Sequence, residues 1–186
     1  MIFSGAVLAG GHSSRFGSDK ARFVLEGKPL LAWVLESFTA AEQTFIVAGQ
    51  DYGEFGVPIF EDLSNVQTPL SGLHSALVHA SCDWVAVAAC DLPFLIPEYW
   101  AVLNAHRGGV RAVLVRRGGR LEPLAALYHR DLANEVFSRL QQDNLSVHGF
   151  LEALTPSETC VLPWESLGLP ERTLTNVNTR SDLEQK

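Results

Sequence analysis

The sequence predicts an α/β protein whose central sheet is mainly parallel. Short apolar segments alternate along the chain with segments whose apolar residues recur at helical spacing. One apolar segment, Trp84–Ala89, is almost unbroken, as expected of a parallel strand that is buried on both faces. The length of 186 residues fits one domain, which we assign to residues 1–186. Strands that alternate with helices favour a parallel sheet covered by helices.

The first half of the chain contains three predicted strands and two predicted helices. Pro29 suits the first position of a helix, and the residues that follow it show a helical apolar pattern. Pro69 and Gly72 are turn formers and indicate a loop. In chain order we expect the strand Gly5–Leu8, the helix Pro29–Phe38, the strands Phe45–Ala48 and Val57–Phe60, a loop at Thr68–Gly72, and a helix over Leu73–Ala80.

The second half continues the alternation after Trp84–Ala89. Thr179 and Asp182 resemble a capping box that opens a terminal helix. Trp33, Trp84 and Trp100 are expected in the core. The other expected elements are the helix Pro97–Ala105, strands Ala112–Val115 and Leu124–Tyr128 around a hairpin or loop at Arg116–Arg120, helices Leu132–Leu140 and Ser146–Leu154, the strand Cys160–Leu162 and a loop at Pro163–Pro170.

The composition limits the kinds of binding partner that we expect for this protein. The formal net charge is −7 and no basic run occurs, so nucleic acid and anionic membrane surfaces are poor candidates. Three cysteines without CxxC spacing favour reduced thiols over a disulfide framework or a zinc site. No apolar run approaches the roughly 20 residues of a membrane-spanning helix. We therefore expect a cytoplasmic protein.

The loop that follows the first strand, from Leu8 to Lys20, has the composition of a phosphate-binding loop. Gly10 and Gly11 allow a sharp turn in which successive N–H groups face an anion. Arg15 and Lys20 add cations that reach phosphate oxygens. The loop is neither a Walker A motif nor a dinucleotide GxGxxG motif. The alternative, a surface loop whose cations face water, explains the glycines alone but not the whole string.

Several polar residues are candidates for the rest of a site. Asp91 follows the central strand, where it either binds Mg²⁺ or caps a helix, and these alternatives are about even. Asp62, taken alone, is more typical of a turn. Asn176 and Asn178 either hold a phosphate or a metal-bound water, or cap a turn, which the sequence favours. Cys90 has no implied histidine partner, so we do not interpret it as a nucleophile.

Six segments together resemble a known family. LAGGHSSRFGSDKA, GKPLL, PLSGL, CDLPFL, EPLAALY and NVNTRSDL occur in the order found in the molybdenum cofactor guanylyltransferases. The resemblance implies a Rossmann-like three-layer α/β/α fold, the nucleotide-diphospho-sugar transferase or glycosyltransferase-A-like fold. It implies that GTP and the molybdopterin form of the molybdenum cofactor react to give the guanine dinucleotide cofactor and diphosphate. Cofactor-delivery proteins and molybdoenzymes are the implied protein partners.

The resemblance also implies roles for single residues. Leu8, Ala9, Gly10, Gly11 and Asp62 would contact the nucleotide, Lys20 its phosphates, and Asp91 a Mg²⁺ ion, while Arg15, Asn178 and Asn176 would belong to the catalytic centre. The chain departs from the family at Ala48-Gly49, where an asparagine often helps to hold the nucleotide, and Gln50 is the nearest substitute.

The expected chemistry is in-line attack of an anionic phosphate on the α-phosphorus of GTP. Such a nucleophile needs no strong general base, so catalysis would depend on positioning and charge neutralisation. Two alternatives stay open. One is a cytidylyltransferase or a sugar-1-phosphate nucleotidyltransferase of the same fold, and the other is a non-catalytic nucleotide-binding module.

Overall fold

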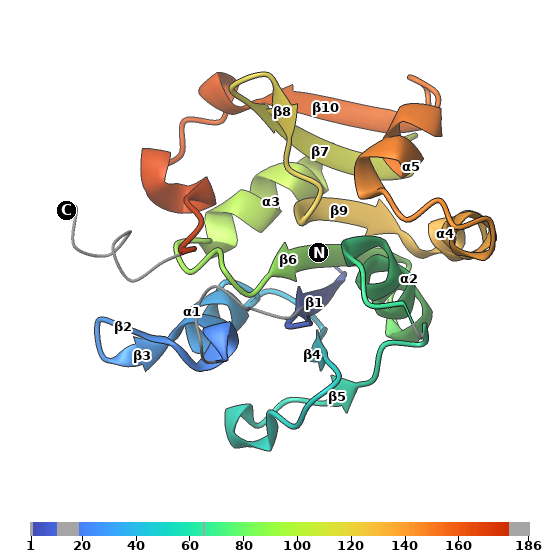
Figure 1. The fold of residues 1–186 in the computed structure, drawn as a ribbon. Helices are drawn as coiled ribbons and strands as arrows, with labels where there is room; N and C mark the ends of the chain where they lie inside the picture. Colours follow the sequence, from blue (N-terminus) through green and yellow to red (C-terminus); the bar gives the residue numbers. More distant parts are fainter. Residues whose placement is uncertain (1, 11–18, 65, 179–186) are drawn as a thin grey trace.

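A twisted sheet forms the centre of the molecule (Figure 1). The computed structural model describes residues 2–10, 19–64 and 66–178. The strand order is β10-β7-β9-β6-β1-β4-β5, with β8 paired to β7. The strands are β1 (Ser4–Leu8), β4 (Gln43–Val47), β5 (Ile59–Phe60), β6 (Trp84–Ala89), β7 (Ala112–Arg117), β8 (Arg120–Leu121), β9 (Ala125–His129) and β10 (Thr159–Pro163).

The sheet is mainly parallel, as predicted. β1 pairs in parallel with β4 and β6, β4 pairs in parallel with β5, and β7 with β10. β9 is inserted between β6 and β7 and runs antiparallel to both. Its first residues therefore lie at the edge where the parallel strands end, and the Ala89 amide donates to the Leu124 carbonyl at 2.9 Å.

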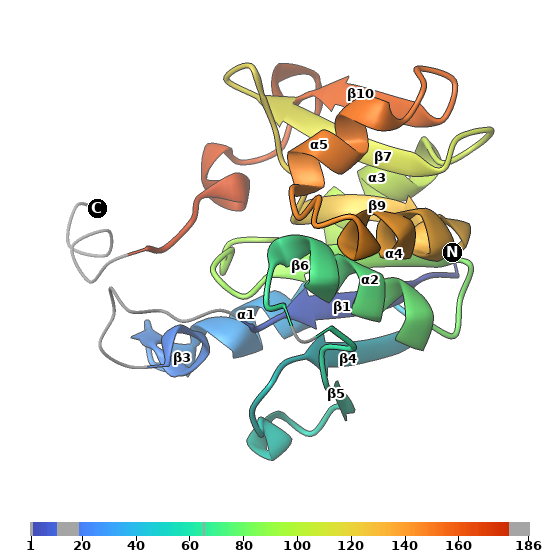
Figure 2. The same ribbon diagram turned by 45° about the vertical axis from the view of Figure 1, so that its right-hand side comes forward.

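Helices cover both faces of the sheet (Figure 2). Successive strand residues point to opposite faces, so Val7 packs into one apolar cluster while Ala6 and Leu8 pack into the other. The first cluster contains α1 (Leu30–Glu36) and α3 (Pro97–Ala105), and the second contains α2 (Pro69–His79), α4 (Ala133–Gln141) and α5 (Val147–Ala153). The predicted three-layer α/β/α architecture is confirmed.

Short elements complete the described fold. The strands β2 (Val24–Leu25) and β3 (Lys28–Pro29) form a small hairpin that the sequence analysis missed. Its turn residues Glu26 and Gly27 both have positive φ, 50° and 82°. The hairpin or loop expected at Arg116–Arg120 is a hairpin, with positive φ at Gly118 and Gly119, and it joins β7 to the short strand β8, which the sequence did not predict. Short 3₁₀ turns cover η1 (Lys20–Arg22), η2 (Gly53–Phe55), η3 (Arg130–Leu132), η4 (Trp164–Ser166) and η5 (Glu171–Leu174).

The predicted loop at Thr68–Gly72 is wrong, because α2 begins at Pro69. Thr68 caps the helix: its hydroxyl accepts from the Ser71 amide, and the Ser71 hydroxyl accepts from the Thr68 amide in return. Proline at the first helical position is compatible with this cap. Gly72 lies in the helix for a packing reason, since a Cβ there would stand 3.1 Å from Leu8 Cδ1. The glycine brings α2 close to the end of β1.

Three further expectations have different outcomes. Trp84 and Trp100 are buried as predicted, but Trp33 is only half-buried. The Trp33 indole N–H donates to the Leu25 carbonyl, and the Lys28 ammonium lies 3.8 Å from its ring centroid. The segment Pro163–Pro170, predicted as a loop, contains the short turn η4. The predicted terminal helix at Thr179 and Asp182 falls outside the described residues.

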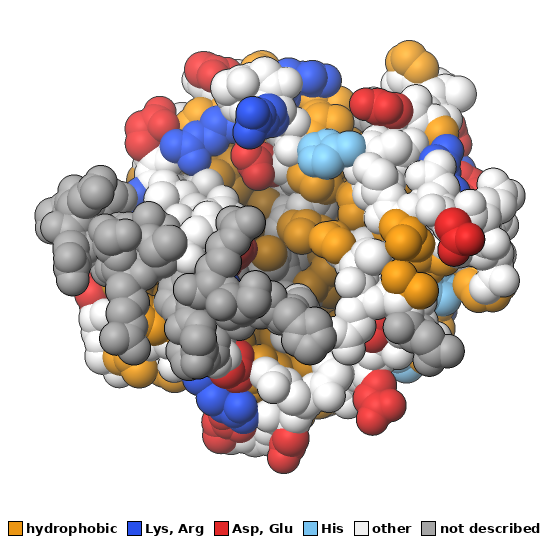
Figure 3. Space-filling model, viewed as in Figure 1, with side chains coloured by type: hydrophobic (Ala, Val, Ile, Leu, Met, Phe, Trp, Pro, Cys, Tyr) orange, Lys and Arg blue, Asp and Glu red, His pale blue; other side chains and the backbone are white. Residues whose placement is uncertain are grey.

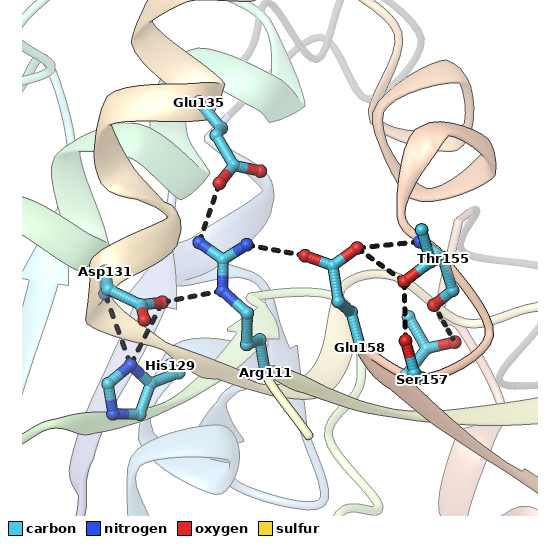
Figure 4. Close-up of polar contacts among 8 residues, drawn as sticks. Arg111, His129, Asp131, Glu135, Thr155, Ser157 and Glu158 are labelled. Carbon is cyan, nitrogen blue, oxygen red and sulfur yellow. Dashed lines mark hydrogen bonds and ion pairs between the residues drawn. The ribbon is translucent and has the colours of Figure 1, made fainter. Parts of the chain in front are cut away.

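A charged cluster lies at the opposite end of the strands, where β7 and β10 begin and β9 ends (Figure 4). The Arg111 guanidinium contacts Glu158 and Glu135 at 2.7 Å each and Asp131 at 3.1 Å. The Thr155 amide and hydroxyl, together with Arg111, hold the pKa of Glu158 at about 2. This cluster fastens the strand starts and is remote from the strand ends described next.

Candidate active site

A pocket of about 650 Å³ opens at the carboxyl ends of β1, β4 and β6. In this type of sheet, ligands bind beyond the carboxyl ends of the strands. Viewed from the side of Figure 1, the surface is hollowed, with hydrophobic side chains on the floor (Figure 3). The lining includes Leu8, Ala9, Gly10, Asp19, Lys20, Ala48, Gly49, Gln50, Asp62, Gln67, Gly72, Cys90, Asp91 and Leu124.

Four predicted residues from distant parts of the chain meet at one side of this pocket. The Lys20 ammonium donates to Asp91 Oδ2 at 2.7 Å and to Asn178 Oδ1 at 2.8 Å. Asn176 Nδ2 donates to Asp91 Oδ1 at 3.2 Å. These contacts span 71, 158 and 85 residues of sequence respectively. The fold thus joins the phosphate-loop lysine, the carboxylate and both asparagines in one polar cluster.

The backbone explains how both asparagines reach this cluster. The Val177 amide donates to the Asp91 carbonyl at 2.9 Å, and the Val177 side chain is buried against Leu25 and Leu30. The two flanking asparagines therefore face the site from either side of an apolar anchor. The interpretation of Asn176 and Asn178 as turn caps is not supported by these contacts.

Asp91 is not the cap of a helix. The next helix, α3, begins six residues later at Pro97, and its N-cap residue is Ile96. The Asp91 carboxylate instead pairs with Lys20, and the side chains of both residues are 17% exposed. At this degree of exposure the pair stays accessible to a ligand in the pocket.

The donor set fits a magnesium ion. Mg²⁺ prefers oxygen ligands and binds proteins through one or two carboxylates together with substrate phosphates. Asp91 supplies one carboxylate on the pocket wall, and the amide oxygens of Asn176 and Asn178 are close by. No three histidines, cysteines or acidic residues among the described residues are placed to hold a metal ion together, so the nucleotide's phosphates would have to complete the coordination.

Leu8, Ala9 and Gly10 line the pocket, and their contacts with a nucleotide stay predictions. The Ala9 amide donates to the Val47 carbonyl at 3.0 Å, which holds the start of the loop against β4. A Cβ at Gly10 would meet no atom of the described residues within 4 Å. Gly11 and Arg15 lie outside the described residues, and their roles stay predictions.

Asp62 lies on the pocket wall, but its carboxylate already has partners. Oδ2 accepts from the Ser71 hydroxyl at 2.6 Å, and Oδ1 accepts from the Ser75 hydroxyl at 3.0 Å. The Ser64 amide also donates to Oδ1, as in the turn that the sequence favours for this residue alone. These bonds fix the start of α2, and a nucleotide contact at Asp62 stays a prediction.

Cys90 lines the pocket with a neutral thiol. Burial, reinforced by the neighbouring Asp91, raises the pKa of Cys90 to about 12. A protonated thiol is a poor nucleophile, so the environment of Cys90 does not favour a covalent role. Cys82, Cys90 and Cys160 are all free cysteines.

Sequence reasoning missed Asp19 and Tyr52. The Tyr52 hydroxyl donates to Asp19 Oδ1 at 3.0 Å, and Gln50 Nε2 donates to Asp19 Oδ2 at 2.9 Å and to the Tyr52 hydroxyl. The available signal was the position of Asp19 directly before Lys20. Gln50, the predicted substitute for the family's asparagine, is thus held by this pair at the pocket wall.

Comparison with known proteins gives a consistent result. The family model of the MobA-like NTP transferase domain matches residues 5–157. The chain is 37% identical to a probable molybdenum cofactor guanylyltransferase of Deinococcus radiodurans, over 97% of this chain and 91% of that protein. It is 34% identical to a protein of the same name from Pyrococcus furiosus, over 97% and 94%.

Solved structures agree. Molybdopterin-guanine dinucleotide biosynthesis protein A from Archaeoglobus fulgidus superposes with a TM-score of 0.83 at 29% identity, covering 97% of this chain and 95% of that chain. The 2-C-methyl-D-erythritol 4-phosphate cytidylyltransferase from Thermus thermophilus superposes with a TM-score of 0.72 at 20% identity, covering 99% and 96%. The second likeness shows the shared fold alone.

Proposed function

Because the chain belongs to the MobA-like NTP transferase family, we propose that it transfers GMP from GTP to molybdopterin and releases diphosphate. The products are the guanine dinucleotide form of the cofactor and diphosphate. The observation that carries the proposal is the cluster of Lys20 and Asp91, which line the pocket, with Asn178, which accepts from the Lys20 ammonium. The names of the relatives support guanylyl transfer over the cytidylyl and sugar-phosphate alternatives.

The pocket has room for a nucleotide on one side and holds the Lys20–Asp91 pair on the other. The β1 loop from Leu8 to Gly10 and the β4 end at Ala48 border the space in which the nucleotide would lie. The Lys20 ammonium stands between Asp91 and Asn178, where it would neutralise charge on the phosphates and on the departing diphosphate. The attacking group is already an anionic phosphate, so the residues need to position it rather than deprotonate it.

Asp91 is the residue that would hold Mg²⁺. When bound there, the ion would supply charge neutralisation at the phosphate oxygens of the nucleotide. Asn176 and Asn178 keep the carboxylate and the Lys20 ammonium in place through the hydrogen bonds described above.

The basic hairpin formed by β7 and β8 would favour an anionic acceptor. Arg116, Arg117 and Arg120 belong to β7 and β8, and basic side chains gather over β8 on the hollowed face (Figure 3). Arg117 also donates to the carbonyls of Leu174 and Glu171, which brings the segment before Asn176 against the hairpin. A local basic surface attracts a phosphate in spite of the net charge of −7.

The remaining parts of the proposal concern the cellular location and the protein partners. No helix among the described residues is long and apolar enough to cross a membrane. We place the activity in the cytoplasm, with molybdopterin brought by a delivery protein and the product passed to molybdoenzymes. Neither nucleic acid nor membrane is part of the proposal.

The test is a turnover assay with molybdopterin and GTP, CTP, ATP or UTP, in which mass spectrometry identifies the dinucleotide. We expect the guanine dinucleotide to dominate. Preferential use of CTP or UTP would reject guanylyl transfer, and GTP binding without diphosphate release would indicate a non-catalytic module.

The same assay tests Asp91. We expect Asp91→Asn to lower kcat on the order of 10²-fold, the usual effect of removing one group that stabilises transition-state charge. The matched control is Asp83→Asn, which makes the same change beside the opposite end of β6. Near-normal turnover of Asp91→Asn at saturating Mg²⁺ would refute the metal assignment.

A further inference from the structure

Asp19 receives hydrogen bonds from two separate segments of the chain. Oδ1 accepts from the Ala21 amide and the Tyr52 hydroxyl, both at 3.0 Å. Oδ2 accepts from Arg22 Nη1 at 3.0 Å and from Gln50 Nε2 at 2.9 Å. Two of the four donors lie just beyond Asp19 and the other two lie beyond β4. The carboxylate therefore joins the η1 turn to the segment that follows β4.

This junction directly precedes the phosphate-loop lysine. Asp19 is the N-cap residue of the 3₁₀ turn that begins at Lys20, and its bond to the Ala21 amide sets the direction in which that turn starts. Lys20 reaches from this turn to Asp91 and Asn178. Lysine side chains lose rotamer entropy when they are fixed, so a rigid origin favours one position of the ammonium.

The partner side of the junction is also rigid. Tyr52 is fully buried, and burial raises the pKa of its hydroxyl, so the O–H stays protonated and donates to Asp19. Arg22 adds a contact to the Asp51 carbonyl and lies 4.8 Å from the Tyr52 ring centroid. The turn is thus fastened to a buried group rather than to a surface side chain.

We propose that Asp19 is a positioning residue that acts through Lys20: it fixes where the Lys20 ammonium stands relative to Asp91 and to the phosphates of the bound nucleotide. The proposal rests on the proposed nucleotidyl transfer for the identity of the ligand. It does not make Asp19 a catalytic group, because its carboxylate is occupied by the four donors.

The substitution Asp19→Asn is the sharpest perturbation. A carboxylate accepts hydrogen bonds at both oxygens, whereas an amide replaces one acceptor with a donor. An amide nitrogen at the position of Oδ1 faces the Ala21 N–H, and at the position of Oδ2 it faces Arg22 and Gln50. In either orientation the amide N–H faces another hydrogen-bond donor, although the size of the side chain is unchanged.

The test is a double-mutant cycle between Asp19 and Lys20. GTP affinity by calorimetry and kcat/KM are measured for the wild type, Asp19→Asn, Lys20→Ala and the double variant. We expect Asp19→Asn to lower both quantities about tenfold when Lys20 is present and less than about twofold when residue 20 is alanine. A purely structural role would give the same loss in both backgrounds, and that result would overturn the proposal.

Two controls keep the result interpretable. The first control is Glu54→Gln. Glu54 accepts from Arg22 Nε at 2.6 Å and does not contact Asp19. We therefore expect this substitution to change GTP affinity by less than twofold. Tyr52→Phe removes one donor to Asp19 and retains the buried ring, so it repeats the cycle if Asp19→Asn fails to fold. An effect of Tyr52→Phe that is equal with and without Lys20 would also reject the proposal.

The two hypotheses fail in different ways. A wild-type protein that binds GTP and forms no dinucleotide contradicts the proposed function, while the cycle in GTP affinity still decides whether Asp19 acts through Lys20. Product formation together with additive losses contradicts the positioning role alone.

Discussion

Gly5, the second residue of β1, offers a direct test of how tightly the sheet packs against the layer that contains α1 and α3. A Cβ on Gly5 would lie 2.6 Å from Phe38 Cγ, 2.7 Å from Cδ1 and 3.0 Å from Cβ. Carbon atoms in ordinary contact are about 3.5–4.0 Å apart, so the substitution Gly5→Ala requires a displacement of about 1 Å. The clash involves the near end of the side chain, which a rotamer change does not remove.

The surroundings of Phe38 resist that displacement. Its ring stacks on Trp100 with centroids 5.0 Å apart, and the Trp100 indole donates to Ser37 Oγ at 2.9 Å. Overpacking of a filled core costs about 1–3 kcal/mol, and these restraints favour the upper half of that range. Alanine recovers roughly 0.4–1 kcal/mol through the smaller entropy of the unfolded chain. The net expected loss is about 2 kcal/mol.

For a chain of this size that loss lowers Tm by about 4–8 °C. The assay is thermal unfolding followed by circular dichroism, with Gly5→Ala compared in the wild type and in a Phe38→Ala background. Phe38→Ala removes Cγ and Cδ1, the two atoms nearest to the added Cβ, and keeps only the Phe38 Cβ contact at 3.0 Å, so Gly5→Ala is expected to cost much less stability in that background. An unchanged Tm for Gly5→Ala, or the same decrease in both backgrounds, would refute the packing argument.

Two other predictions use the charged and thiol groups described above. Because the pKa of Glu158 in the folded protein, about 2, lies below the ordinary value of 4.5, its contribution to stability is present above pH 4.5 and is lost as the pH falls toward 2. The Tm deficit of Glu158→Gln is therefore expected at pH 7 and should shrink below pH 4.5, and a deficit independent of pH would contradict the assignment. Because the pKa of Cys90 is raised to about 12, we expect iodoacetamide at pH 8 to label this thiol at least about tenfold more slowly than free cysteine, as measured by peptide mass spectrometry. Rapid labelling of Cys90 would show that the thiolate forms readily.

Local patterns in the sequence were sufficient for most of the sheet. Trp84–Ala89 was recognisable because a strand buried on both faces is continuously apolar, and Asp91 followed from its place after that strand. Thr68–Gly72 was misinterpreted because proline and glycine are usually turn signals. Here proline opens the helix and glycine makes room for Leu8, a reason that only the packing reveals.

The assembly of the site could not be read from local patterns. Asn176 and Asn178 look like turn residues until the Val177 amide is seen to bond to the Asp91 carbonyl. The Asp19–Tyr52 contact joins residues 33 positions apart, and nothing in the spacing of these residues indicates it. Family resemblance identified several of these positions, but it does not explain which residues hold them in place.

The 158-residue separation between Lys20 and Asn178 has a consequence for synthesis. A domain generally folds as a unit, and synthesis proceeds at about 5–20 residues per second. The strands β1, β4 and β6 around the pocket have all been synthesised when Ala89 is added, well before Asn178. The contact between Lys20 and Asn178 therefore forms only after these strands have been made, and the polar cluster depends on the whole span from residue 20 to residue 178.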